Sequence, residues 1–132
     1  MSKNKIKQIL NKKNKSQIIC LTSYSKNISK IIDKYCDIIL VGDSLSMVLY
    51  GMKSTREIKI DTMILHGKTV KKSTSKSLVV IDMPYNTYNN KFIAYKNAKK
   101  ILKLTKCDAV KLEGGKKIVN KKKYLTKKKI PV

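Results

Sequence analysis

Short apolar runs rich in β-branched residues alternate along this chain with segments of helical periodicity, and that alternation limits the folds open to it. Runs over residues 17–22, 37–42, 77–82 and 109–113 are apolar at consecutive positions rather than at every second one. Continuous runs of this kind are typical of parallel strands buried on both faces. Residues 130–132 are a candidate start of a fifth strand.

Helical patterns separate these runs. Apolar side chains recur at helical spacing over residues 25–35, 61–72 and 91–105, and more weakly over 116–128. Asp61 is the expected N-cap of the second helix, and the side chains expected to face inward from that helix are Ile64, Leu65 and Val70. The order of strands and helices predicts an α/β fold with a parallel sheet and right-handed crossovers.

A faint internal repeat supports the same fold class. Residues 34–42 resemble residues 105–113, since each segment holds a helix end, a Cys-Asp corner and an apolar strand. Repeated βα units of this kind fit a barrel, but a doubly wound open sheet would show them too.

The placement of the acids is informative, because the chain has only eight. Asp43, Asp82 and Glu113 each lie at the C-terminal end of a different predicted strand. Parallel strands bring these ends to one face, where barrels and open α/β sheets hold their active sites. Carboxylates gathered there repel one another unless a cation is present, and hard oxygen ligands suit Mg²⁺. The alternative is that each acid caps a helix or ends a strand by chance.

Lys111 belongs to the same predicted face. It lies two residues before Glu113 on one strand, and side chains two apart on a strand point the same way. A lysine within a buried strand is costly unless it is paired. We therefore expect Lys111 to meet the acids or an anionic substrate.

The formal net charge of +23 raises nucleic acid as a partner. However, only one of the 31 cationic residues is arginine, the residue that most nucleic-acid readers use for bidentate contacts. The lysines are spread along the chain with abundant Asn and Ile, as in drift toward AT-rich codons. We expect no specific nucleic-acid partner, and a small basic RNA-associated protein remains the alternative from another functional class.

The remaining sequence features predict no special chemistry. No apolar run reaches the length of a membrane span, and residues 1–15 lack the apolar core of a signal peptide, so a cytoplasmic location is expected. The three cysteines show no metal or disulfide spacing, and burial is expected for Cys20, Cys36 and Cys107. The single histidine, His66, lies mid-helix and is expected to pack against a neighbour.

Several motifs, in the same order, resemble the ketopantoate hydroxymethyltransferase family. Residues 41–48, VGDSLSMV, resemble the family's VGDSLGMV, and residues 109–115 resemble its AVKLEGG strand. Weaker likenesses are LTSY at 21–24, Gly51 with Ser54-Thr55, DTMILH at 61–66, DMPY at 82–85 and Asn97-Ala98. The resemblance implies that residues 1–132 form the N-terminal half of a (β/α)₈ TIM barrel, with about four to five parallel strands.

The resemblance also implies an activity. Family members form homo-oligomers and transfer a hydroxymethyl group from 5,10-methylenetetrahydrofolate to 3-methyl-2-oxobutanoate, giving 2-dehydropantoate for pantothenate synthesis. Mg²⁺ would be held by Asp43, Asp82 and Glu113, and the keto acid by Asp43, Ser44, Asp82 and Lys111. An alternative is another Mg²⁺-dependent keto-acid barrel, of the phosphoenolpyruvate mutase and isocitrate lyase type, which would share the acids but is not expected to show VKLEGG.

The chain departs from the family pattern in three respects. Ser46 replaces a glycine and is expected to crowd the loop after Asp43, and Ser25 stands where an aspartate often occurs. The family's general base is a glutamate on a later strand, beyond residues 130–132, and a barrel of this class needs roughly 250 residues. No catalytic residue is therefore assigned in this chain, and we expect the chain alone to be inactive.

Overall fold

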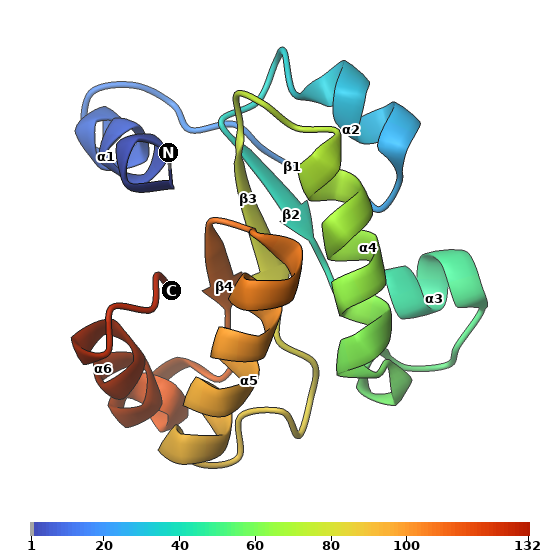
Figure 1. The fold of residues 1–132 in the computed structure, drawn as a ribbon, viewed down its shortest axis with the longest axis vertical. Helices are drawn as coiled ribbons and strands as arrows, with labels where there is room; N and C mark the ends of the chain where they lie inside the picture. Colours follow the sequence, from blue (N-terminus) through green and yellow to red (C-terminus); the bar gives the residue numbers. More distant parts are fainter. Residues whose placement is uncertain (1) are drawn as a thin grey trace.

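The computed structural model describes residues 2–132, and its centre is a parallel four-stranded sheet (Figure 1). Strand order follows the sequence, β1-β2-β3-β4, and the strands are β1 (Cys20–Thr22), β2 (Ile38–Val41), β3 (Leu78–Asp82) and β4 (Ala109–Lys111). Each strand pairs in parallel with the next. This order has no reversal of the kind that marks a doubly wound sheet, so it favours one side of a barrel and confirms the predicted α/β class.

Six α-helices and two short 3₁₀-helices connect and flank the strands in the described residues. They are α1 (Ser2–Lys12), α2 (Lys26–Ile32), α3 (Leu45–Tyr50), η1 (Thr55–Glu57), α4 (Ile60–Lys72), α5 (Lys91–Thr105), η2 (Gly115–Ile118) and α6 (Val119–Lys127). The four predicted helices are present as α2, α4, α5 and α6, with shorter bounds for α2 and for α6, which begins at Val119. Neither α1 nor α3 was predicted.

Two details predicted for α4 are wrong. The helix begins at Ile60 with Lys59 as its N-cap, so Asp61 lies in the first turn, where it accepts a hydrogen bond from Lys100 Nζ at 2.6 Å. Leu65 is 64% exposed. The face toward the sheet instead carries Met63, Ile64, Gly67 and Val70.

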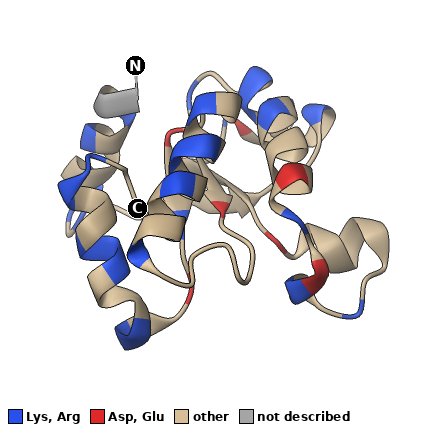
Figure 2. Cartoon of the chain, turned by 60° about the horizontal axis from the view of Figure 1, so that its bottom comes forward, with Lys and Arg blue, Asp and Glu red and all other residues tan. Residues whose placement is uncertain are grey.

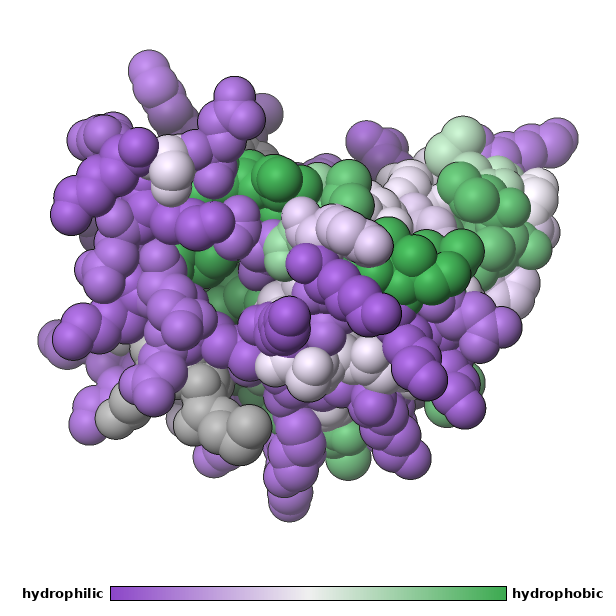
Figure 3. Space-filling model, turned by 90° about the horizontal axis from the view of Figure 1, so that it is seen from above, coloured by the Kyte–Doolittle hydropathy of each residue, from purple (hydrophilic) through white to green (hydrophobic). Residues whose placement is uncertain are grey.

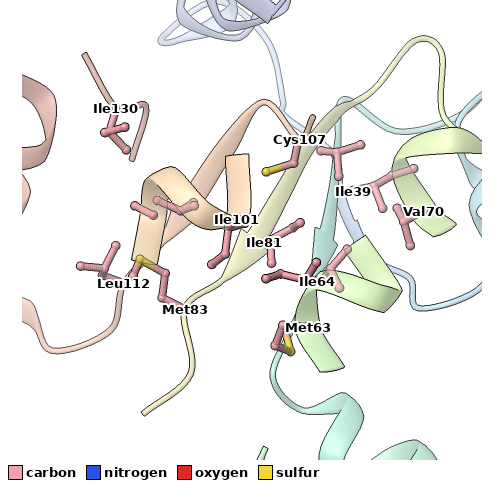
Figure 4. Close-up of a cluster of buried hydrophobic side chains, with 14 of the residues drawn as sticks. Ile39, Met63, Ile64, Val70, Ile81, Met83, Ile101, Cys107, Leu112 and Ile130 are labelled. Atoms are coloured by element: carbon pink, nitrogen blue, oxygen red, sulfur yellow. The ribbon is translucent and has the colours of Figure 1, made fainter. Parts of the chain in front are cut away.

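The core lies between the sheet and helices α4 and α5 (Figure 4). Ile39, Val79 and Ile81 point from the strands into this layer and are fully buried, as are Val70 of α4 and Ile101 of α5. Burying side chains of this size stabilises the fold by roughly 1.5–3 kcal/mol each. The packing is close enough that a Cβ on Gly67 would lie 2.3 Å from Ile81 Cδ1.

The other face of the sheet is incompletely covered. A cavity of about 510 Å³ lies between this face and α1, lined by apolar side chains including Ile9, Ile38 and Val80. Ion pairing and hydrogen bonding attach α1 to the ends of the strands, through Lys5 Nζ to the Ser77 carbonyl at 2.9 Å and through Lys12 Nζ to an Asp37 oxygen at 2.6 Å. Figure 3 shows apolar surface set among hydrophilic side chains on the face seen from above.

The predicted fifth strand is not formed. Val110 N of β4 donates a hydrogen bond to the Pro131 carbonyl at 3.1 Å, so the chain after α6 does reach the edge of β4. No second bond of a ladder joins residues 130–132 to that edge in the described chain. The segment lies beside β4 without being a strand.

Two of the three cysteines are buried as the sequence predicts, and the lysines lie on several helices. Cys36 and Cys107 are buried as predicted, but Cys20 is exposed because β1 is an edge strand with exposed residues throughout. Lysines occur on α1, α2, α4, α5 and α6 (Figure 2), so the positive charge is distributed over several helices and not confined to one of them. Within residues 2–132, every helix is too short or too polar to cross a membrane.

Candidate active site

Three neighbouring strands end at the same level, and their ends carry the acids that the sequence singled out. Asp82 is the last residue of β3 and is paired in register with Lys111, the last residue of β4. Asp43 follows the end of β2 by two residues, and Glu113 follows the end of β4 by two. Parallel pairing therefore brings these four side chains to one mouth of the sheet.

Lys111 joins two of the acids. Its Nζ donates to Asp82 Oδ1 at 2.6 Å and to Glu113 Oε1 at 2.7 Å. Burial alone would lower the pKa of Lys111, but the hydrogen bonds to Asp82 and Glu113 outweigh it and leave the pKa raised. Lys111 is thus held as an ammonium group between a buried carboxylate and an exposed one, as its position on β4 predicts.

Asp43 and Asp82 form a second close pair. The Asp43 backbone N–H donates to Asp82 Oδ2 at 3.2 Å. Burial, followed by the neighbouring Asp82 and Glu113 charges, raises the pKa of Asp43. The pKa of Asp82 is also raised, chiefly by burial, although Lys111 opposes the shift. Both carboxylates would therefore gain from an additional cation at this mouth.

The donor set fits Mg²⁺ through two of the three predicted ligands. Mg²⁺ prefers hard oxygen atoms and commonly takes one or two carboxylates, leaving its other positions to water and substrate. Asp43 and Asp82 suit this role. Among the described residues, no group of three His, Cys, Asp or Glu side chains is gathered closely enough to hold a metal. Ligation of Mg²⁺ by Asp43, Asp82 and Glu113 stays a prediction, and for Glu113 it would require the Lys111–Glu113 pair to open.

Ser44 is held by a contact that the sequence did not reveal. Its Oγ lies 2.7 Å from the Tyr24 hydroxyl, which comes from the segment after β1. His66 Nδ1 lies 2.7 Å from the Tyr24 carbonyl and its Nε2 lies 2.9 Å from the Tyr50 hydroxyl, so the single histidine packs against neighbours as expected. A Cβ on Gly42 would lie 3.0 Å from Ser44 Oγ, which explains a glycine at this position.

A hollow of about 450 Å³ opens beside Asp43 and Glu113. Its wall includes Arg56, whose guanidinium lies 4.7 Å from the centre of the Tyr85 ring. Nothing in the periodicity of the sequence marks Arg56, because it lies in η1, a single short 3₁₀ turn before α4. Sequence reasoning missed this hollow for that reason.

Comparison with known proteins decides the family. The model of the ketopantoate hydroxymethyltransferase family matches residues 3–132. The chain belongs to this family. The 3-methyl-2-oxobutanoate hydroxymethyltransferase of Pelagibacter ubique is 57% identical over 128 residues, covering 97% of this chain and 50% of the relative.

Further curated relatives carry the same description. The Rhizobium etli protein is 49% identical over 116 residues, covering 87% of this chain and 42% of the relative, and the Anaplasma marginale (strain Florida) protein is 50% identical over 121 residues, covering 92% and 44%. The chain thus spans about half the length of the curated relatives it matches.

A solved structure shows the fold independently of sequence. The chain resembles 2,3-dimethylmalate lyase, a member of the phosphoenolpyruvate mutase and isocitrate lyase superfamily, with a TM-score of 0.68 at 10% identity. The match covers 98% of this chain and 50% of that one. It confirms the predicted half of a TIM barrel, while the sequence match places the chain with the ketopantoate hydroxymethyltransferases rather than with the lyases.

Ser46, which stands where the ketopantoate hydroxymethyltransferase motif has a glycine, fits into the structure but lowers its stability. The residue is fully buried at the start of α3. Its Oγ is the one buried side-chain polar atom among the described residues that lacks a hydrogen-bond partner. A buried hydroxyl without a partner destabilises a fold by about 1–3 kcal/mol.

Proposed function

We propose that this chain supplies the N-terminal half of the active site of a 3-methyl-2-oxobutanoate hydroxymethyltransferase. The reaction transfers a hydroxymethyl group from 5,10-methylenetetrahydrofolate to 3-methyl-2-oxobutanoate and gives 2-dehydropantoate. One observation carries the proposal: Asp43, Asp82, Lys111 and Glu113 converge from three adjacent strand ends. The 57% identity to a relative described by this activity supports it.

Different residues at the mouth can bind different groups of the keto acid. Lys111 is an ammonium group with a raised pKa, and it can exchange its exposed partner Glu113 for the substrate carboxylate. The hydroxyl of Ser44, held by Tyr24, lies beside the same strand ends and can donate to a substrate oxygen. Mg²⁺ on Asp43 and Asp82 would supply Lewis acidity toward the keto oxygen.

Removal of the C3 proton needs a positioned base. Asp82 is committed to Lys111 and to the Asp43 backbone, so it is poorly placed for that role. We assign no base within residues 2–132, and we expect the 132-residue chain alone to give little transfer. We further propose that the chain acts as part of one barrel domain, in a cytoplasmic homo-oligomer, as the family resemblance and the sequence imply.

Calorimetric titration of the chain with 3-methyl-2-oxobutanoate, with and without Mg²⁺, tests the proposal. We expect binding that depends on Mg²⁺ and weakens roughly tenfold or more in Asp82→Asn, because a charged hydrogen bond contributes about 1.5–3 kcal/mol. Asp61→Asn is the control, since Asp61 is an exposed acid with one lysine partner on the outer helices. Circular dichroism establishes that each variant is folded. An affinity for 3-methyl-2-oxobutanoate that does not depend on Mg²⁺, or that is unchanged in Asp82→Asn, contradicts the proposal.

A further inference from the structure

His66 is the single histidine of the chain, and it joins two segments that flank Ser44. Its Nδ1 lies 2.7 Å from the carbonyl oxygen of Tyr24, in the segment after β1. Its Nε2 lies 2.9 Å from the hydroxyl of Tyr50, the last residue of α3, and the two rings meet edge to face. Figure 1 shows α3 beside α4, the helix that carries His66. One imidazole thus connects two elements that are distant in the sequence.

The contact with the carbonyl determines which ring nitrogen carries the proton. A carbonyl oxygen can only accept a hydrogen bond, so His66 Nδ1 donates to Tyr24 O. In a neutral imidazole the other nitrogen is then an acceptor, and the Tyr50 hydroxyl donates to His66 Nε2. Both ring nitrogens are therefore used, and the ring holds the Tyr24 backbone against the end of α3.

The side chain of Tyr24 extends this constraint to the mouth of the sheet. Its hydroxyl lies 2.7 Å from Ser44 Oγ. A phenol hydroxyl is more acidic than an alcohol hydroxyl and is the better donor, so Tyr24 donates and Ser44 accepts. The proton of the Ser44 hydroxyl is then left for another acceptor. Ser44 Oγ lies close to the acids, because a Cβ on Gly42 would lie 3.0 Å from it and 3.5 Å from Asp82 Oδ2.

We propose that His66 is a positioning residue for the keto-acid site. It holds the Tyr24 backbone and α3 in one arrangement, and Tyr24 in turn keeps the Ser44 hydroxyl oriented as a donor to an oxygen of the substrate. The inference rests on the proposed function, because the keto acid is the acceptor of that hydrogen bond. His66 acts through Tyr24 and Ser44 and takes no part in the chemistry itself.

Calorimetric titration of the full chain with 3-methyl-2-oxobutanoate in the presence of Mg²⁺ tests this role. We expect Ser44→Ala to weaken binding about tenfold, because it removes a hydrogen bond to a charged ligand. His66→Leu and Tyr24→Phe should each weaken it roughly fivefold, since Ser44 then loses its orientation but keeps its hydroxyl. His66→Asn should restore most of the affinity, because its amide nitrogen can take the place of Nδ1 and donate to the Tyr24 carbonyl. Thr69→Ala removes an exposed hydroxyl from the same helix and should leave the affinity unchanged.

A double-mutant cycle distinguishes positioning from a loss of structure. If His66 acts through Ser44, His66→Leu should weaken binding less than about twofold in a chain that already carries Ser44→Ala. A structural defect would weaken binding by the same factor in both backgrounds, and that result would overturn the inference. Circular dichroism checks the folding of each variant. Tyr24→Phe takes the place of His66→Leu in the cycle if the latter does not fold.

Because the chain has one histidine, its imidazole also gives an unambiguous signal without substrate. Spectra of the ¹⁵N-labelled ring at about pH 8, above the usual titration range of imidazole, should show the proton on Nδ1 and an acceptor at Nε2. A proton on Nε2 would overturn the inference. The same holds for an affinity that is unchanged in both His66→Leu and Tyr24→Phe while Ser44→Ala weakens binding, and this result leaves the proposed function intact. A wild-type chain that shows the Nδ1 proton but binds no keto acid would instead refute the proposed function, and the positioning role with it.

Discussion

Asp33 ties the end of α2 to the start of β3, and its substitution gives a sharp test of how the barrel half is held together. One carboxylate accepts backbone hydrogen bonds from Ser75, Lys76 and Ser77, at 2.8–3.2 Å, and a side-chain bond from the Ser75 hydroxyl. Burial by itself raises the pKa of Asp33, but the hydrogen bonds led by Ser77 N–H outweigh it and lower the pKa from 3.8 to about 2.

This pKa shift sets the size of the expected effect. A lowering of the Asp33 pKa from 3.8 to about 2 corresponds to roughly 2 kcal/mol of folding free energy at neutral pH. Because the pKa is lower in the folded chain, the contribution is complete above about pH 5 and is lost as pH falls through 4 toward 2. We expect Asp33→Asn to lower the free energy of unfolding by roughly 2 kcal/mol at pH 7, and to lower it much less near pH 2.

Urea unfolding at both pH values, followed by circular dichroism, measures this difference. Asp61→Asn is again the matched control, since an exposed ion pair contributes only about 0–1 kcal/mol. An effect of Asp33→Asn below about 0.5 kcal/mol at pH 7, or an equal effect at both pH values, would refute the reasoning.

Three further predictions follow from packing. Ser46→Ala should raise the free energy of unfolding by about 1 kcal/mol in urea titrations, because it removes a buried hydroxyl that has no partner; a destabilised variant contradicts this. Gly67→Ala should lower the free energy of unfolding by about 1–3 kcal/mol, because its Cβ would lie 2.3 Å from Ile81 Cδ1, and this clash outweighs the preference of alanine for a helix. A gain in stability would contradict the packing described. With Ellman's reagent, Cys20 should react at least about tenfold faster than Cys36 and Cys107, because both are buried and the pKa of Cys107 is raised to about 11 by burial; equal rates in the folded chain contradict this.

Most of the sheet was predictable from the sequence, because buried parallel strands leave continuous β-branched runs. The structure shortens these runs where a strand lies at an edge: β1 begins at Cys20, and Ile18 and Ile19 before it are exposed. The unpredicted helix α1 does carry Ile6, Ile9 and Leu10 at helical spacing, but the surrounding lysines hid that signal. Helix α3 has no charged residues and four of its hydrophobic side chains are about half exposed or more, so no amphipathic pattern marks it.

The candidate site was predictable for the same reason as the sheet. Strand ends are easily located, so the sequence identified Asp43, Asp82, Lys111 and Glu113. Contacts between loops carry no periodicity, which explains why the Tyr24–Ser44 hydrogen bond and the position of Arg56 over Tyr85 came only from the structure.

The central claim is that a divalent cation binds at the mouth formed by the ends of β2, β3 and β4. Paramagnetic broadening by Mn²⁺, substituted for Mg²⁺, locates that cation directly in amide ¹H–¹⁵N spectra of the chain. We predict that substoichiometric Mn²⁺ broadens the signals of Asp43, Asp82 and Glu113 first and leaves those of Asp37 and Asp108, at the opposite ends of the strands, intact. Broadening first at Asp37 or Asp108, or evenly across all the acids, would contradict the account.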